Sequence, residues 1–105
     1  MKAAIKYPGK DWEWVTHDNS LKFLQSIVGG YIESAPNGKT KAIIYCNEDG
    51  KELNLEKNII VQDKFGCSYI ICGPVIMLGP VDDDGDTTSL TQELFDKTVS
   101  QLEYL

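Results

Sequence analysis

Arginine is absent from this chain of 105 residues, and all ten of its basic residues are lysines. Sixteen Asp and Glu residues outnumber them, so the net charge is −6. Binding to nucleic acid depends on neutralising phosphates with Lys and Arg, and bidentate recognition of phosphate or guanine relies chiefly on Arg. The composition therefore argues against a DNA- or RNA-binding protein, and we expect no nucleic-acid partner.

Long apolar runs are also missing. No stretch approaches the roughly 20 apolar residues of a membrane span. The first ten residues, MKAAIKYPGK, lack the apolar core of a secretory signal. We expect a cytoplasmic protein without a membrane partner.

Residues that commonly carry metal or nucleophile chemistry are few. The three cysteines, Cys46, Cys67 and Cys72, form no Cys-x-x-Cys pair, and His17 is the only histidine, so a tetrahedral zinc site would lack ligands. The cysteines sit in apolar runs typical of reduced, buried thiols. No nucleophile elbow or phosphate-binding glycine loop is present. We expect a protein without a cofactor and without enzymatic activity.

What is present describes an ordinary globular protein. Hydrophobic residues make up 42% of the chain and charged residues 25%, a balance typical of a single soluble domain over 1–105. The patterns predict an α+β fold: a mostly antiparallel sheet of about five or six strands, with two main helices packed on one face. The expected strands are 2–7, 11–18, 31–35, 41–46, 51–55 and 67–79.

Turn and cap signals divide these elements. Asn19 or Ser20 can cap a helix over 21–28, which Gly29-Gly30 would end. Asn47-Glu48-Asp49-Gly50 predicts a hairpin connection to a returning strand at 51–55, with Gly50 at positive φ. The apolar segment 67–79 predicts a central strand, in which Gly73-Pro74 is a bulge or a break.

A second helix is predicted near the end of the chain. Ser89 and Gln92 match a capping box that would open it at Leu90. Leu90, Leu94, Val99 and Leu102 fall on one side and predict its buried face.

Acidic residues concentrate in the second half of the chain. Residues 1–45 carry six lysines and four acids, whereas residues 46–105 carry four lysines and twelve acids. Four aspartates lie within residues 82–86, and Glu93, Asp96 and Glu103 are spaced to share one stripe of the second helix. Such a strip could imitate a phosphate backbone and bind a host protein with a basic surface. The predicted partner-binding residues are Asp82, Asp83, Asp84, Asp86, Glu93 and Asp96. A solvated surface that keeps the protein soluble is the alternative.

Two other uses of these residue types are weaker. Asp82, Asp84, Asp86 and Glu93 are spaced like calcium ligands, but an EF-hand loop needs glycine at its sixth position and Gly85 is fourth. A polar loop entering a helix explains the same carboxylates, so we expect no metal. Trp12, Trp14, Tyr31 and Tyr45 could form an exposed aromatic platform, although such residues are more often core.

Several short motifs together resemble the domain-of-unknown-function family numbered 3846. They are Val28-Gly29-Gly30-Tyr31-Ile32-Glu33, Asn47-Glu48-Asp49-Gly50-Lys51, Asn58, Gly73-Pro74-Val75, and Asp82-Asp83-Asp84-Gly85-Asp86 running into Ser89-Leu90-Thr91. The resemblance covers about residues 1 to 93 and implies a short protein of a phage, plasmid or integrated element. Where the family tends to show Asn-Arg, this chain has Asn58-Ile59. The motif positions are structural, so the resemblance implies fold more than chemistry.

Three hypotheses about function follow. The first is an accessory protein of a phage or mobile element, acting in the host cytoplasm, that binds and inhibits a host protein such as a CRISPR or restriction nuclease. The second is a sponge for a nucleotide signal, whose pocket would use the aromatic residues and the backbone amides near Gly29-Gly30, with Lys22, Lys39 or Lys41 in place of arginine. The third is a structural or regulatory module, for example a homodimer paired through a sheet edge.

Overall fold

The chain folds into two antiparallel sheets and two helices in a computed structural model that describes all residues, 1–105. The larger sheet has five strands, in the order β2 (Glu13–Thr16), β1 (Lys2–Lys6), β7 (Val75–Leu78), β4 (Ile43–Asn47) and β3 (Ile32–Ser34). The smaller has three, in the order β6 (Ser68–Cys72), β5 (Lys57–Gln62) and β8 (Glu103–Tyr104). The α+β class and the antiparallel pairing are thus confirmed.

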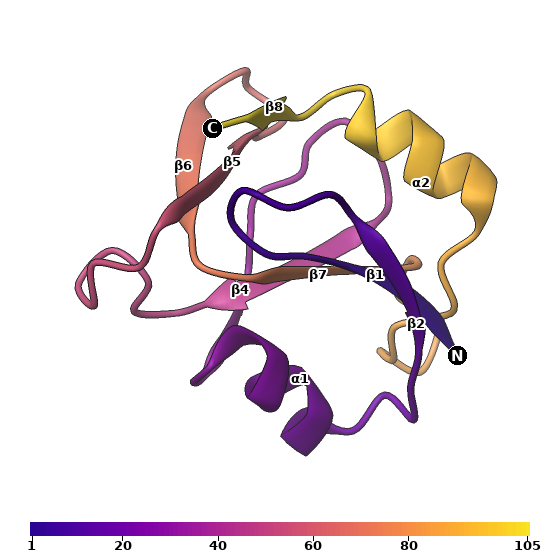
Figure 1. Cartoon of the computed structure of the whole chain (residues 1–105). Coiled ribbons are helices and arrows are strands. Elements are labelled where there is room, and N and C mark those ends of the chain that lie inside the picture. The colour runs from indigo at the N-terminus through magenta and orange to yellow at the C-terminus, as the bar shows by residue number, and fades with distance from the viewer.

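The two helices lie on opposite faces of the five-stranded sheet (Figure 1). Helix α1 (Leu21–Val28) places Leu24 in a cluster with Ile5 and Ile76. Helix α2 (Gln92–Val99) packs on the other face, where Met77 is buried. The expectation that both helices share one face is therefore wrong. Strand side chains alternate between faces, and the central strands β1 and β7 are apolar on both, so each face needs a cover.

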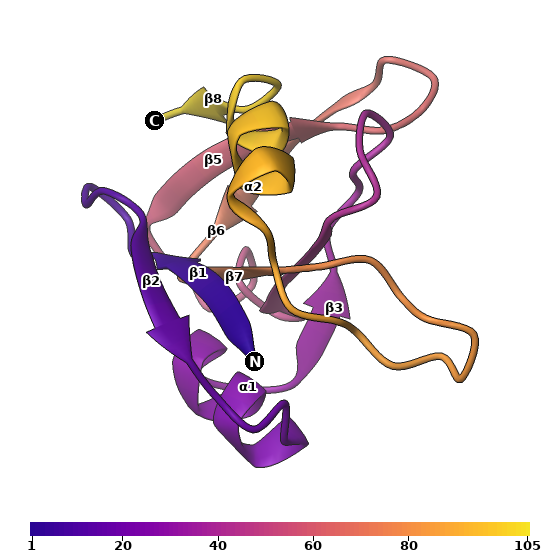
Figure 2. The same ribbon diagram turned by 90° about the vertical axis from the view of Figure 1, so that its right-hand side faces the viewer.

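The smaller sheet helps α2 to cover that second face (Figure 2). Ile59, Val61 and Ile71 belong to the same buried cluster as Ile44 and Met77. The core thus consists of two layers, one on each side of the larger sheet.

Helix α1 begins and ends where the sequence predicts. The Ser20 hydroxyl accepts a hydrogen bond from the Phe23 N–H at 3.1 Å, and Gly29 takes a left-handed conformation with φ of 81°. Both features satisfy backbone groups that a helix end leaves unpaired.

Helix α2 starts at Gln92, two residues later than the predicted start at Leu90. Thr91, not Ser89, accepts from the Leu94 N–H. The Ser89 hydroxyl instead accepts from the backbone N–H of Lys2 at 2.7 Å, and the Leu90 N–H donates to the Lys2 carbonyl. Contacts with the start of β1 thus keep Ser89 out of the helix.

The largest differences from the sequence prediction lie between residues 50 and 79. Residues 51–54 form exposed turns instead of a returning strand, and Gly50 is not at positive φ. A Cβ at Gly50 would lie 2.6 Å from the Cys72 carbonyl oxygen, so close backbone approach explains this glycine. The segment 67–79 is two strands, β6 and β7, in different sheets. Gly73, at φ of 88°, forms the corner between them, so the break is the alternative at Gly73-Pro74 that is confirmed.

Candidate functional site

The acidic loop, residues 82–86, is an ordered turn that projects from the body on the side away from the smaller sheet (Figure 2). One Asp82 carboxylate oxygen accepts the N–H groups of Asp84 and Asp86 at 2.9 and 3.0 Å. The Asp82 N–H donates to the Asp86 carbonyl at 2.8 Å. Asp82 therefore shapes the loop, because its side chain replaces backbone partners in the turn.

Threonines anchor the acidic loop to the rest of the molecule. The Thr88 hydroxyl donates to the Pro80 carbonyl at 2.6 Å, across the base of the loop. The buried Thr87 hydroxyl donates to the Asn19 side-chain oxygen at 2.9 Å, which ties the loop to the segment before α1. The loop is thus held at both of its ends.

The charge of the acidic loop has no counter-ion within the protein. All four aspartates are exposed, and the one ion pair of the structure joins Lys97 to Glu93. Four like charges within five positions repel each other, by about 1 kcal/mol per pair at 4 Å in water. The loop therefore presents uncompensated negative charge to a partner or to solvent.

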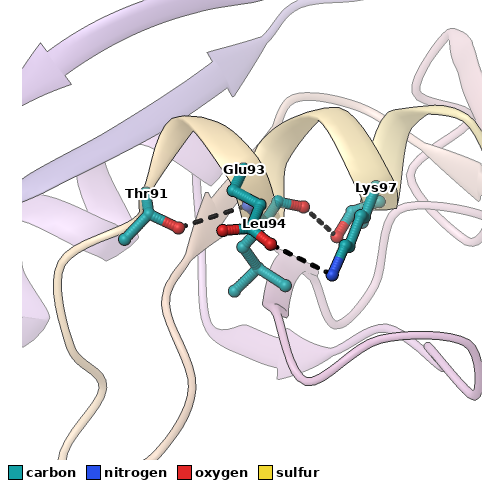
Figure 3. A network of polar contacts seen from close by, with 5 residues as sticks. Thr91, Glu93, Leu94 and Lys97 are labelled. Carbon is teal, nitrogen blue, oxygen red and sulfur yellow. Dashed lines mark hydrogen bonds and ion pairs between the residues drawn. The ribbon is translucent and has the colours of Figure 1, made fainter.

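The two predicted acidic residues that lie on α2 have polar partners within the protein, unlike Asp83 and Asp84 of the acidic loop. Glu93 pairs with Lys97 at 3.2 Å, one turn along the helix (Figure 3). The Asp96 carboxylate accepts from the Gln92 side chain at 2.9 Å. Glu103 is not on the helix but in β8, so the predicted stripe of three is wrong in its last member. The six predicted partner-binding residues thus form two groups, four in the acidic loop and two on α2.

No group of three or more His, Cys, Asp or Glu side chains is arranged to hold a metal ion. The carboxylates considered as calcium ligands, those of Asp82, Asp84, Asp86 and Glu93, therefore do not converge. Asp82 would be the first calcium ligand of such a site, but one of its carboxylate oxygens already accepts hydrogen bonds from two backbone N–H groups.

The cysteines and the histidine are not arranged as a catalytic pair. Cys46 is buried, and this burial, with the nearby charge of Glu33, raises the pKa of its thiol to about 11. His17 stacks on Phe23 with ring centroids 5.1 Å apart, and its Nε2 is buried without a hydrogen-bond partner. No hydrogen bond links His17 to a cysteine. Cys67, by contrast with the prediction of three buried thiols, is exposed.

The aromatic residues do not form a shared platform. Trp12 and Trp14 both contact Phe95 of α2, with ring centroids 5.8 and 5.2 Å apart. Tyr45 packs in the cluster beneath α1 on the other face, and Tyr31 is 70% exposed.

Sequence reasoning missed a buried polar pair, Lys6 and Asn58. The two residues are 5% and 0% exposed, and Lys6 Nζ donates to Asn58 Oδ1 at 2.8 Å. A signal was available, because Asn58 opens an apolar run, Ile59-Ile60-Val61, where an amide is out of place.

These features define a small, two-sheet α+β protein with an acidic loop fixed at its surface. The chain belongs to the family described as Domain of unknown function (DUF3846), whose profile matches residues 1–103. No curated protein and no solved structure shows significant similarity to the chain. Neither helix has the length and apolar character needed to cross a bilayer.

Proposed function

We propose that this protein is a non-enzymatic binding protein that uses its acidic loop to engage a host protein with a basic surface. The observation that carries the proposal is the combination of order and uncompensated charge in the loop. Asp82 holds the turn, while Asp83 and Asp84 are exposed and make no side-chain hydrogen bond or ion pair. Because Asp82 holds the backbone of the turn, less conformational entropy is lost when a partner binds these carboxylates.

The partner that fits best is a protein that binds phosphate backbones, such as a CRISPR or restriction nuclease. Its nucleic-acid channel is lined with basic residues that attract closely spaced negative charge. Asp83, Asp84 and Asp86 at the tip provide such charge, and Asp96 adds to it from α2. We propose that the protein serves a phage or other mobile element in the host cytoplasm and inhibits the nuclease by occupying that channel. The resemblance noted from the sequence motifs supports this context.

The environments of Cys46 and His17 support a non-enzymatic role. The raised pKa of Cys46 keeps its thiol protonated near neutral pH, and thiols react as thiolates. The Nε2 atom of His17 is buried without a hydrogen-bond partner, so no group is in place from which it could take a proton as a general base.

A nucleotide sponge is less well supported at the position considered from the sequence. The N–H groups of Gly29 and Gly30 both donate to the Gln25 carbonyl, at 2.9 and 3.2 Å, and close the end of α1. They are therefore not free to bind a phosphate. For a homodimer, the candidate pairing surfaces are the edge strands of the two sheets, β2, β3, β6 and the short β8.

The test compares two charge reversals of equal size. Asp83→Lys with Asp84→Lys alters the acidic loop, whereas Glu48→Lys with Glu52→Lys alters an exposed turn elsewhere. Host lysate is passed over each immobilised protein at low and high salt, and a captured nuclease is assayed with each variant. We expect the loop variant alone to lose capture at least tenfold, and wild-type capture to fall at high salt because exposed charges are screened. Equal capture by both variants would refute the proposal that the acidic loop is the binding surface. Capture of a nuclease without inhibition would refute only the proposal that the protein occupies the nucleic-acid channel.

A further inference from the structure

An open pocket of about 640 Å³ lies beside the end of β1. Three aromatic residues, Trp12, Phe95 and Tyr104, line it, together with the exposed Lys10 and Asp11. Lys6 lines it as well. A concave, mostly apolar wall with a few placed polar groups is the usual form of a small-molecule site.

The wall is held together by contacts between distant parts of the chain. The Trp12 indole N–H donates to the Tyr104 hydroxyl at 3.0 Å, which joins the loop after β1 to β8. The Trp12 and Phe95 rings meet edge to face, and Phe95 belongs to α2. The pocket is therefore built by the folded structure before any ligand arrives.

Lys6 is the unusual member of this wall. It is 5% exposed, and its ammonium lies 5.3 Å from the centre of the Tyr104 ring. One of its three N–H donors is used by Asn58, and no carboxylate lies within ion-pair distance. A buried charge without a counter-ion is costly, and burial indeed lowers the pKa of Lys6, while Asp11 partly opposes this effect. An anion in the pocket would remove the cost.

We propose that this pocket binds a small organic monoanion, a carboxylate carried on an aromatic or apolar body. The carboxylate accepts hydrogen bonds from Lys6 Nζ, and the body packs against Trp12, Phe95 and Tyr104. This site is separate from the acidic loop and does not depend on the function proposed for it.

The charges around the pocket favour one negative charge over two. Lys6 and Lys10 are the cationic side chains of its lining, and Asp11 is anionic. Val99, the last residue of α2, also lines the pocket, so the C-terminal end of that helix, which carries partial negative charge, borders the site. A phosphate dianion would meet both Asp11 and this helix end, whereas a monocarboxylate needs only Lys6.

The test uses two probes of nearly equal shape, naphthalene-2-carboxylate and naphthalene-2-carboxamide. Binding is followed by heteronuclear NMR through the indole N–H signals of Trp12 and Trp14. Lys6→Met removes the ammonium and keeps the length of the side chain. Lys22→Met is the matched control, because Lys22 is exposed on α1, on the far face of the sheet.

We expect the carboxylate to shift the Trp12 signal saturably and to bind at least tenfold more tightly than the amide, because a charge-assisted hydrogen bond is stronger than a neutral one. Lys6→Met should abolish this preference and retain amide binding, whereas Lys22→Met should leave both unchanged. The proposal is overturned if neither probe shifts Trp12 up to about 5 mM, or if the preference survives Lys6→Met. If Lys6→Met does not fold, equal affinity of the two probes for the wild type overturns it. If adenosine monophosphate binds more tightly than the carboxylate, the proposed preference of the pocket for a monoanion is overturned.

Discussion

Lys6 and Asn58 are 52 positions apart in the chain and exchange two hydrogen bonds in its interior. Lys6 Nζ donates to Asn58 Oδ1 at 2.8 Å, and Asn58 Nδ2 donates to the Lys6 carbonyl at 2.9 Å. The same amide nitrogen donates to the Gly73 carbonyl at 2.9 Å. Asn58 thus joins β1 of the larger sheet, β5 of the smaller sheet and the corner between β6 and β7.

Replacing Asn58 should therefore destabilise the fold. Asn58→Ala removes three buried hydrogen bonds and leaves the Lys6 ammonium without an acceptor. Net losses of about 1 kcal/mol per bond come to about 3 kcal/mol, and the unpaired charge adds to this, so we expect a loss of more than about 3 kcal/mol. Urea unfolding measures it. Gln101→Ala, which removes an exposed amide, is the control and should change stability by less than about 0.5 kcal/mol. Similar unfolding midpoints for the two variants would contradict the role of Asn58.

The acidic loop should respond differently at neighbouring aspartates. Asp83 and Asp84 make no side-chain hydrogen bond, so Asp83→Asn with Asp84→Asn relieves repulsion and should not lower the melting temperature. Asp82→Ala removes the acceptor of two backbone N–H groups and should cost about 1 kcal/mol. The melting temperatures of the double variant and of Asp82→Ala, measured by thermal unfolding at low salt, distinguish these two effects. A clear loss in the Asp83/Asp84 variant would mean that these carboxylates are structural.

Calcium provides a separate test of the same loop. Because the carboxylates do not converge, millimolar calcium should leave the melting temperature unchanged. A rise that depends on calcium concentration would reveal a metal bound to the native state.

His17 should make stability depend on pH. Burial, followed by the charge of the N-terminal amine, lowers the pKa of His17 in the folded protein, while Asp18 has a smaller, opposite effect. The unfolded chain, with a histidine pKa of about 6.5, therefore binds more protons between the two values. The contribution of neutral His17 to the free energy of unfolding is fully present above about pH 6.5. It is lost as the pH falls towards the pKa of His17 in the folded protein. His17→Gln should therefore make the melting temperature depend less on pH below about pH 6.5. An unchanged slope in this variant would assign the dependence to other groups.

The cysteines should differ in reactivity. Cys67 is exposed, whereas Cys46 and Cys72 are buried and the pKa of Cys46 is raised to about 11. Iodoacetamide at mildly alkaline pH should label Cys67 alone in the native protein and all three cysteines after unfolding. Intact-mass and peptide mass spectrometry measure the labels. Native labelling at Cys46 as fast as at Cys67 would contradict the buried placement.

The features that the sequence determined by itself are local. The Ser20 cap, the apolar spacing of Leu24 and Val28, and the Gly29 end all lie within ten residues, and α1 forms as they predict. The acidic loop is likewise recognisable from its composition, and its neighbouring strand and helix were both expected. Caps and periodicity act between residues a few positions apart, so the sequence alone carries them.

Only the tertiary structure decided how the strands divide between two sheets. The apolar segment 67–79 reads as one strand, but Gly73 turns it from the smaller sheet into the larger. The partners of Lys6 and Ser89 come from positions more than 50 residues away. Because β1 and β7 are buried on both faces, α1 packs on one face of the larger sheet, and α2 and the smaller sheet pack on the other. These outcomes depend on long-range packing, whose energy no local pattern contains.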